Sequence, residues 1–64
     1  MEKNLTEKSA AELLGVSAKT MQAWRWLDRG PRYIKFSNRA IRYRESDLQD
    51  FIKTNIVGTA EHAA

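Results

Sequence analysis

The dipeptide Gly30-Pro31 divides the chain into two parts that differ in hydrophobic periodicity. Before it, apolar residues recur at helical spacing, and a glycine followed by a proline ends a helix because proline cannot donate the next backbone hydrogen bond. After it, residues 33–36 and 40–43 alternate between apolar and polar types, which is typical of β-strands. The 64 residues have room for one small domain, so a two-domain enzyme is excluded and a fold of helices and strands is expected.

Two short helices are predicted before Gly30. Thr6 is a typical N-cap residue for the first helix, which ends near Leu14 because Gly15 can adopt the left-handed conformation found after helix ends. Ser17 can cap the second helix, which is expected to reach residue 27 or 28. The helical period gives this second helix a packing face and an exposed face. The packing face is predicted to hold Met21, Trp24 and Leu27, and the exposed face Lys19, Gln22, Ala23 and Trp26.

A β-hairpin and a third helix are predicted after the proline. The alternation indicates two strands around a turn at residues 37–39, with one face buried and the other exposed. Residues 45–54 return to helical spacing and begin with acidic residues, which favour a helix N-terminus. The expected buried face of the hairpin is Ile34, Phe36, Ile41 and Tyr43, its exposed face is Tyr33, Lys35, Arg42 and Arg44, and the third helix carries Leu48, Phe51 and Ile52.

These elements predict an α+β fold with the order α-α-β-β-α. The domain is expected to span residues 5–54, between an N-terminal extension of residues 1–4 and a flexible C-terminal tail of residues 55–64 without periodicity. The longest uncharged stretch, residues 54–60, is far shorter than the ~20 apolar residues of a membrane helix. The N-terminus also lacks the apolar segment of a signal peptide, so a cytoplasmic protein without membrane contact is expected.

The charge of the chain is concentrated in its middle segment. Residues 17–44 carry eight Lys or Arg residues and one acid, Asp28, which gives this segment a net charge of +7. The flanking segments are acidic, with −1 over residues 1–16 and −3 over residues 45–64. Such a cationic segment is typical of proteins that bind nucleic acids, because Lys and Arg release the counterions condensed on phosphates. A solvated cationic surface without a partner is the alternative.

Two helices joined by a short turn that contains glycine form a helix-turn-helix signature. Together with the hairpin, the order of motifs resembles the MerR-like winged helix-turn-helix domains of the excisionase and AlpA type, which are small DNA-binding proteins of phages and mobile elements. The resemblance covers Leu5 to Ile52. It rests on LT at 5–6, AAELLGVS at 10–17, T-M-x-x-W-R at 20–25, GPRYIKF at 30–36 and I-R-Y-R-x-x-D-L at 41–48.

This resemblance implies that the second helix enters the major groove of double-stranded DNA and that the hairpin is a wing on the backbone or the minor groove. It further implies an excisionase, a recombination directionality factor that assists an integrase at attachment sites, with neighbouring copies bound side by side. A phage or prophage transcriptional regulator with the same domain is the first alternative, and a protein-interaction module is the second. The chain departs from the family pattern at Ser9, Asp28 and Trp26.

The candidate DNA contacts on the second helix lie at its start and on its exposed face. Lys and Gln side chains can hydrogen-bond base edges, and a small residue between them permits close approach. Hydroxyls at the helix start suit a phosphate, although capping explains Ser17 equally well. Arg25 can reach a phosphate or pair with Asp28. The predicted contacts are Ser17, Lys19, Thr20, Gln22, Ala23 and Arg25.

The candidate contacts on the wing are cationic residues and one tyrosine. Arg39, at the turn, is the best placed for a narrow minor groove. Asp47 can instead form an ion pair with Arg44 or Arg42 and give one of them a structural role. The exposed indole of Trp26 has three open roles: contact with a partner chain, packing on an arginine, or cover for the wing. The predicted wing contacts are Tyr33, Lys35, Arg39, Arg42 and Arg44.

No constellation of residues in the sequence points to catalysis, a metal or a cofactor. There is no Cys, the single His62 falls in the predicted tail, and no glycine-rich phosphate loop occurs. Asp47 and Asp50 are typical of an ordinary helix surface. We therefore expect a protein that is not an enzyme and that requires neither metal nor cofactor.

Overall fold

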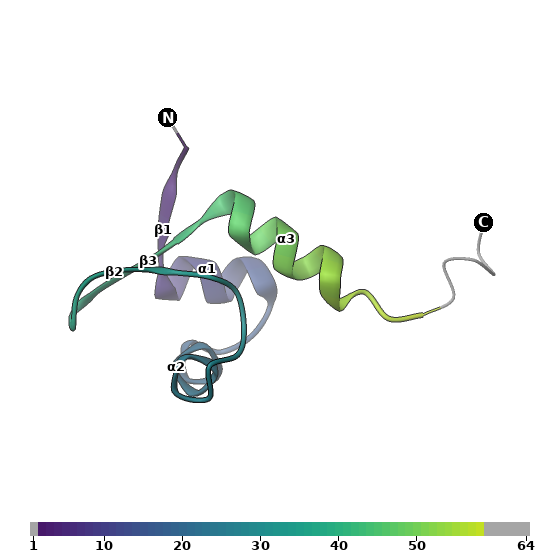
Figure 1. The fold of residues 1–64 in the computed structure, drawn as a ribbon, viewed down its shortest axis with the longest axis horizontal. Coiled ribbons are helices and arrows are strands. Elements are labelled where there is room, and N and C mark those ends of the chain that lie inside the picture. The colour runs from purple at the N-terminus through teal and green to yellow at the C-terminus, as the bar shows by residue number, and fades with distance from the viewer. Residues whose placement is uncertain (1, 59–64) are drawn as a thin grey trace.

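The computed structural model describes residues 2–58, which form three helices and a three-stranded antiparallel sheet (Figure 1). The fold is the α+β architecture of a small winged helix-turn-helix, as predicted, with one more strand than expected. The sheet order is β1-β3-β2, so β3 is the central strand. The elements in chain order are β1 (Asn4–Thr6), α1 (Glu7–Leu14), α2 (Ala18–Trp26), β2 (Ile34–Ser37), β3 (Ala40–Arg44) and α3 (Glu45–Asn55).

The additional strand is β1, which begins inside the segment expected to be an extension. Asn4 pairs with Arg44, and Leu5 pairs with Tyr43 on the edge of β3 that faces away from β2. A strand of three residues is too short to show a period of two in the sequence. It forms because β3 offers it an unpaired edge and because Leu5 reaches the core, where it is buried.

Both predicted N-caps are confirmed. Thr6 Oγ1 accepts a hydrogen bond from Ser9 N at 3.1 Å, and Ser17 Oγ accepts one from Thr20 N at 3.0 Å. These bonds satisfy backbone N–H groups that have no partner within the first turn of a helix. Gly15 has a φ of +74°, the left-handed conformation expected of it, and turns the chain from α1 into the start of α2.

The end of α2 is closed by a left-handed residue that is not glycine. Asp28 has a φ of +59°, and the next residue, Arg29, donates from its backbone N to Trp24 O at 2.7 Å. This arrangement gives a carbonyl of the last turn its hydrogen bond. Because the helix ends at Trp26 and the chain then reverses, Leu27 lies beyond the core and is 62% exposed, so its predicted packing role is wrong.

Trp24 joins α2 to α3 and to the loop that follows α2. Its ring centroid lies 5.4 Å from that of Phe51. On the other side the backbone of Gly30 lies so close that an added Cβ would stand 2.9 Å from Trp24 Cε3. With a φ of +84°, Gly30 therefore serves both a left-handed turn and a close approach that no other residue permits.

The core is small and draws on every element except β2. β1 and β3 contribute from the sheet, and the three helices contribute one or two side chains each. Since β2 has no side chain in the buried set, it projects from the domain as the outer strand of the hairpin. The buried hydrophobic residues are Leu5, Ala10, Ala11, Met21, Ile41, Tyr43 and Leu48.

The predicted faces of the hairpin are correct for β3 and wrong for β2. Ile41 and Tyr43 are buried, as expected, but Phe36 is 64% exposed. The cause is a β-bulge between Lys35 and Ser37, which shifts the register of β2 by one residue. Successive side chains of a strand point to opposite faces, so the shift exchanges the two faces of β2. The resulting pairs are Ile34 with Arg42, Lys35 with Ile41, and Ser37 with Ala40.

The exchange moves the residues expected on the outer face of the sheet to its inner face, which carries Ile41 and Tyr43. Lys35 lies directly opposite Ile41. Tyr33, just before β2, places its ring centroid 5.9 Å from that of Tyr43. Ile34 is opposite Arg42 and is only half-buried. The predicted exposed face of Tyr33, Lys35, Arg42 and Arg44 is therefore divided between the two faces of the sheet.

Helix α3 closes the domain and is confirmed close to its predicted range. Leu48 is buried, whereas Ile52 is 40% exposed. Arg44 occupies the N-cap without a side-chain cap, and Glu2 instead accepts a hydrogen bond from Ser46 N at 2.7 Å. None of the helices in residues 2–58 is long and apolar enough to cross a membrane. Residues 59–64 of the predicted tail lie outside the described residues.

Candidate nucleic-acid interface

The exposed face of α2 carries the residues predicted to read bases. Lys19, Gln22 and Ala23 are all exposed. Met21, on the opposite face, is completely buried and fixes which side of α2 meets the solvent. Trp26, seven residues after Lys19 and therefore on the same face, is 88% exposed. This face offers hydrogen-bond donors and acceptors beside a small residue, and it includes no acid.

The start of α2 has a local hydrogen-bond system of its own. Ser17 Oγ accepts from Thr20 N, and the two hydroxyl oxygens lie 2.9 Å apart. The capping role left open for Ser17 is thus present in the structure. Thr20 is half-buried, whereas Ser17 is exposed. Their predicted contact with a phosphate stays a prediction, and any such contact would be made beside a cap that already exists.

Arg25 is held by an acid that the sequence did not suggest. Its Nε donates to Glu7 Oε2 at 2.7 Å and its Nη2 donates to Glu7 Oε1 at 3.3 Å, while Asp28 takes no part. Tyr43 donates its hydroxyl to Glu7 Oε2 at 3.1 Å. The Arg25 guanidinium also lies 5.8 Å from the centre of the Tyr33 ring. Glu7 therefore ties α2 to β3 and to the first turn of α1.

This network has clear electrostatic consequences. The hydrogen bonds to Glu7 raise the pKa of Arg25 above its usual value. Burial, followed by the hydrogen bond to Glu7, raises the pKa of Tyr43 well above its usual range. The Arg25 and Glu7 side chains are 23% and 16% exposed, so the pair is only partly shielded from solvent. Arg25 therefore has a structural role in holding α2 in place, in addition to its predicted contact with DNA.

The cations of the hairpin fall into two groups. Lys35 and Arg39 are exposed, and Arg39 lies at the turn, where its backbone N donates to Ser37 Oγ at 3.3 Å. Arg44 is instead bound by Asp47, with Nε and Oδ2 2.7 Å apart, and this pairing lowers the pKa of Asp47. The structural role left open for Arg44 or Arg42 is thereby assigned to Arg44. Arg42 donates from Nη1 to the carbonyl oxygen of Ile41 at 2.8 Å.

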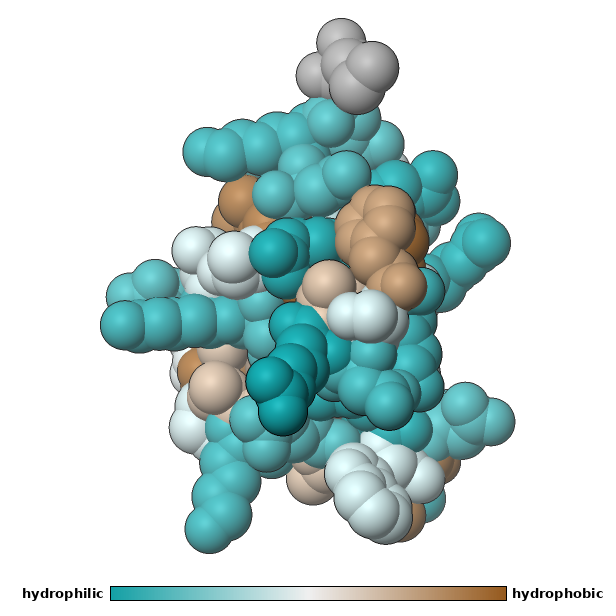
Figure 2. Space-filling model, turned by 90° about the vertical axis from the view of Figure 1, so that its left-hand side faces the viewer, coloured by the Kyte–Doolittle hydropathy of each residue, from teal (hydrophilic) through white to brown (hydrophobic). Residues whose placement is uncertain are grey.

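A hollow lies between the C-terminal end of α2 and the hairpin. Seen from the end of the molecule that carries the hairpin, the surface is mostly hydrophilic, with smaller hydrophobic patches (Figure 2). None of the side chains that line the hollow is acidic, and four of the five can donate hydrogen bonds from nitrogen. The lining residues are Arg25, Trp26, Tyr33, Lys35 and Asn38.

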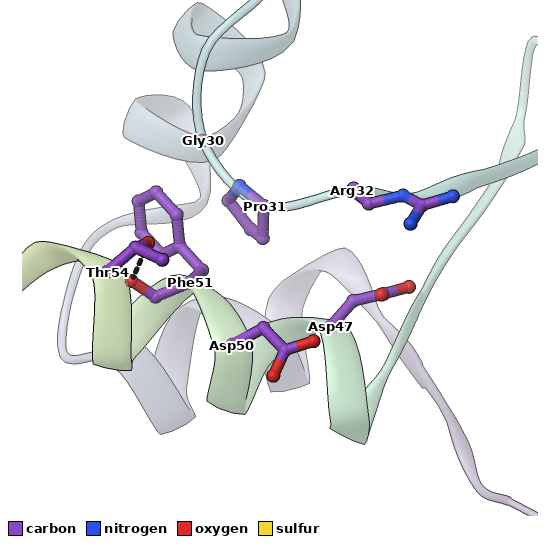
Figure 3. Close-up of a pocket in the computed structure, with 7 residues that line it drawn as sticks. All are labelled: Gly30, Pro31, Arg32, Asp47, Asp50, Phe51 and Thr54. Carbon is purple, nitrogen blue, oxygen red and sulfur yellow. Dashed lines mark hydrogen bonds between the residues drawn. The ribbon is translucent and has the colours of Figure 1, made fainter.

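A second hollow lies on the side of α3 and has a different character. Pro31 and Phe51 face each other across it, and the carboxyl groups of Asp47 and Asp50 lie below Arg32 (Figure 3). Thr54 donates to Phe51 O at 3.0 Å at its far end. Its carboxylates make it a poor place for a phosphate. Within residues 2–58 no group of His, Cys, Asp and Glu is arranged to hold a metal ion.

Comparison with known proteins identifies the family to which the chain belongs. A family model described as a helix-turn-helix domain matches residues 5–56, which is most of the chain. The chain belongs to this helix-turn-helix domain family. Membership supports sequence-specific binding of double-stranded DNA. A search of the curated proteins and a search of the solved structures found no match.

Sequence reasoning missed three structural features, two of which leave no signal in the sequence. Glu7 is 18 residues from Arg25 and 36 from Tyr43, and no local spacing connects them. The bulge that places Lys35 on the inner face of the sheet cannot be predicted from the residue types of β2. The third feature is the left-handed Asp28, which follows the C-cap residue of α2; it had a signal in the sequence, because aspartate adopts this conformation more often than most residues.

Proposed function

We propose that this protein is a sequence-specific double-stranded DNA-binding protein of the excisionase type, a recombination directionality factor that assists an integrase at attachment sites. The observation that carries the DNA-binding part is the exposed face of α2, where the side chains of Lys19 and Gln22 make no hydrogen bond or ion pair with the described residues and Ala23 lies beside them. Met21 and Trp24 hold the opposite face of the helix against the domain.

The proposed mechanism divides recognition between two elements. Helix α2 lies in the major groove, where Lys19 can hydrogen-bond guanine and Gln22 can pair with adenine. The hairpin lies along the backbone or the adjacent minor groove, with Arg39 at its turn. Phosphate contacts fix the register, and base contacts give the sequence preference. The role is not enzymatic and requires neither metal nor cofactor.

The excisionase assignment is supported by the motif order shared with MerR-like domains of excisionases and AlpA-type proteins, and it implies a phage or mobile-element origin. A single domain of this size covers few base pairs, so neighbouring copies on the DNA are part of the proposal. The same domain can act as a transcriptional regulator, and a protein-interaction module is the remaining alternative.

The experiment that tests the proposal maps the sites bound by the protein in the genome that encodes it. Occupied, repeated sites next to an integrase gene, together with loss of excision when the protein is removed, are expected. Gln22→Ala should lower both the occupancy of these sites and the frequency of excision, and Gln49→Ala, an exposed position on α3, serves as the matched control. Occupied sites confined to promoters, with excision unchanged, would replace the excisionase with a transcriptional regulator.

A further inference from the structure

The hollow between α2 and the hairpin contains Trp26, a residue to which the proposed function gives no role. Trp26 is 88% exposed, although a tryptophan of this size is normally covered by the rest of the protein. Its neighbours in the hollow are two cationic side chains, an amide and a tyrosine, and none of them is acidic. The indole N–H is a hydrogen-bond donor, and Lys35 supplies a positive charge beside it.

The position of the hollow is set by two separate structural devices. The helical period places Trp26 on the same face as Lys19, Gln22 and Ala23, but one turn nearer the hairpin. The bulge in β2 turns Lys35 to the inner face of the sheet, where it lines the hollow with Trp26. Without the bulge, Lys35 would lie on the outer face and the hollow would lose its only lysine.

We propose that this hollow is a phosphate seat: it holds one backbone phosphate of the bound DNA, which accepts hydrogen bonds from the indole of Trp26 and the ammonium of Lys35. This inference rests on the proposed function. With α2 in the major groove and the hairpin in the minor groove, the sugar–phosphate strand that separates the two grooves must cross the space between them. The Asn38 amide, at the turn, provides a further donor on that path.

Arg25 is a further cationic side chain that lines the seat. Its guanidinium is fixed by Glu7 and lies 5.8 Å from the Tyr33 ring, so it lines the hollow without being free to leave it. The pairing with Glu7 neutralises part of its charge, which leaves Lys35 as the main positive charge for the phosphate. The seat thereby gives Trp26 a function that does not need a partner protein.

The first test measures binding of a fluorescently labelled duplex of random sequence across a salt series. Lys35→Gln is compared with Lys53→Gln, which makes the same change in charge at an exposed site in the last turn of α3. For Lys35→Gln we expect weaker binding. The slope of the logarithm of the binding constant against the logarithm of the salt concentration should become shallower by about 0.9, the value for one phosphate contact. Lys53→Gln should leave the slope unchanged.

The second test observes Trp26 directly. The protein has two tryptophans, and the indole N–H signal lost in Trp26→Phe identifies Trp26 in a nitrogen–proton correlation spectrum. On addition of the duplex the Trp26 signal should shift, while that of Trp24, packed between Gly30 and Phe51, should stay near its position. Trp26→Phe should bind several-fold more weakly with an unchanged melting temperature, because the side chain is 88% exposed.

The outcomes separate the seat from the proposed function. If the unaltered protein binds duplex DNA while Lys35→Gln behaves like Lys53→Gln and the Trp26 signal does not move, the seat is overturned and DNA binding stands. If the protein binds no duplex even at low salt, both are overturned, and the surroundings of Trp26 must be assigned to a protein partner. A reduced slope for Lys35→Gln together with a shifted Trp26 signal supports the seat.

Discussion

Glu7 is the residue whose replacement should reveal most about how the interface is held. It accepts hydrogen bonds from Arg25 Nε at 2.7 Å, from Arg25 Nη2 at 3.3 Å and from the Tyr43 hydroxyl at 3.1 Å. Glu7→Gln keeps the shape of the side chain and one oxygen. This oxygen can still accept hydrogen bonds from Arg25 Nε and from the Tyr43 hydroxyl. The amide nitrogen then faces Nη2, donor against donor, and the charge of the pair is lost.

The expected size of the effect comes from these contacts. A hydrogen bond between charged groups contributes about 1.5–3 kcal/mol and a neutral one about 0.5–1.5, so the loss of charge costs roughly 1–2 kcal/mol. The lower part of that range is the better value, because Arg25 keeps 23% of its side chain exposed and solvent screens the pair. For a domain of this size, 1 kcal/mol lowers the melting temperature by about 4–8 °C.

Thermal unfolding followed by circular dichroism measures this change directly. Glu12→Gln on the same helix is the control, since Glu12 is exposed and makes no side-chain hydrogen bond or ion pair with the described residues. A double-mutant cycle of Glu7→Gln and Arg25→Met isolates the pair itself. Equal melting temperatures for the two glutamine variants, or a coupling energy near zero, would refute the view that Glu7 holds α2 against the sheet.

Three further predictions concern stability and use similar unfolding measurements. Gly30→Ala should destabilise the protein by more than Gly15→Ala: both residues have positive φ, but only at Gly30 would the new Cβ meet Trp24, at 2.9 Å. Equal losses would contradict the close approach. Ser17→Ala should cost about 1 kcal/mol through the lost cap, whereas Ser46→Ala, which removes no cap, should cost little. Because Arg44 lowers the pKa of Asp47 below its ordinary 3.8, the folded state gains stability above that pH and loses it as the pH falls through the lowered pKa. Asp47→Asn should therefore make the free energy of unfolding fall less steeply as the pH is lowered below 3.8. An unchanged pH dependence would mean that the pair of Arg44 and Asp47 does not contribute.

The parts of the fold that could be predicted are those set by residues close in the chain. Thr6 and Ser17 cap helices through bonds to the third residue after them, and Gly15 ends α1 by its own conformation. Such contacts depend on residue type and spacing alone. The exposure of Lys19, Gln22 and Ala23 was predictable for the same reason, since one buried position on a helix fixes the opposite face.

The parts that were missed depend on contacts between distant segments. β1 exists because β3 has an unpaired edge, and a three-residue strand has no period to detect. The bulge in β2 exchanges two faces whose alternation looked regular, and it left Phe36 exposed and Lys35 inward. Arg25 was matched to Asp28 because the two are neighbours, whereas the fold brings Glu7 to it from the start of α1.

The most direct test of the central claim is a selection of bound sites from a library of random DNA duplexes. The α2 face with Lys19 and Gln22 should enrich a short motif, and Gln22→Ala should lose preference at one base pair, at a cost of about 1–3 kcal/mol. Gln49→Ala should enrich the same motif as the unaltered protein. A library that shows no enriched motif, or a motif that Gln22→Ala leaves unchanged, would contradict the claim that α2 reads the sequence of double-stranded DNA.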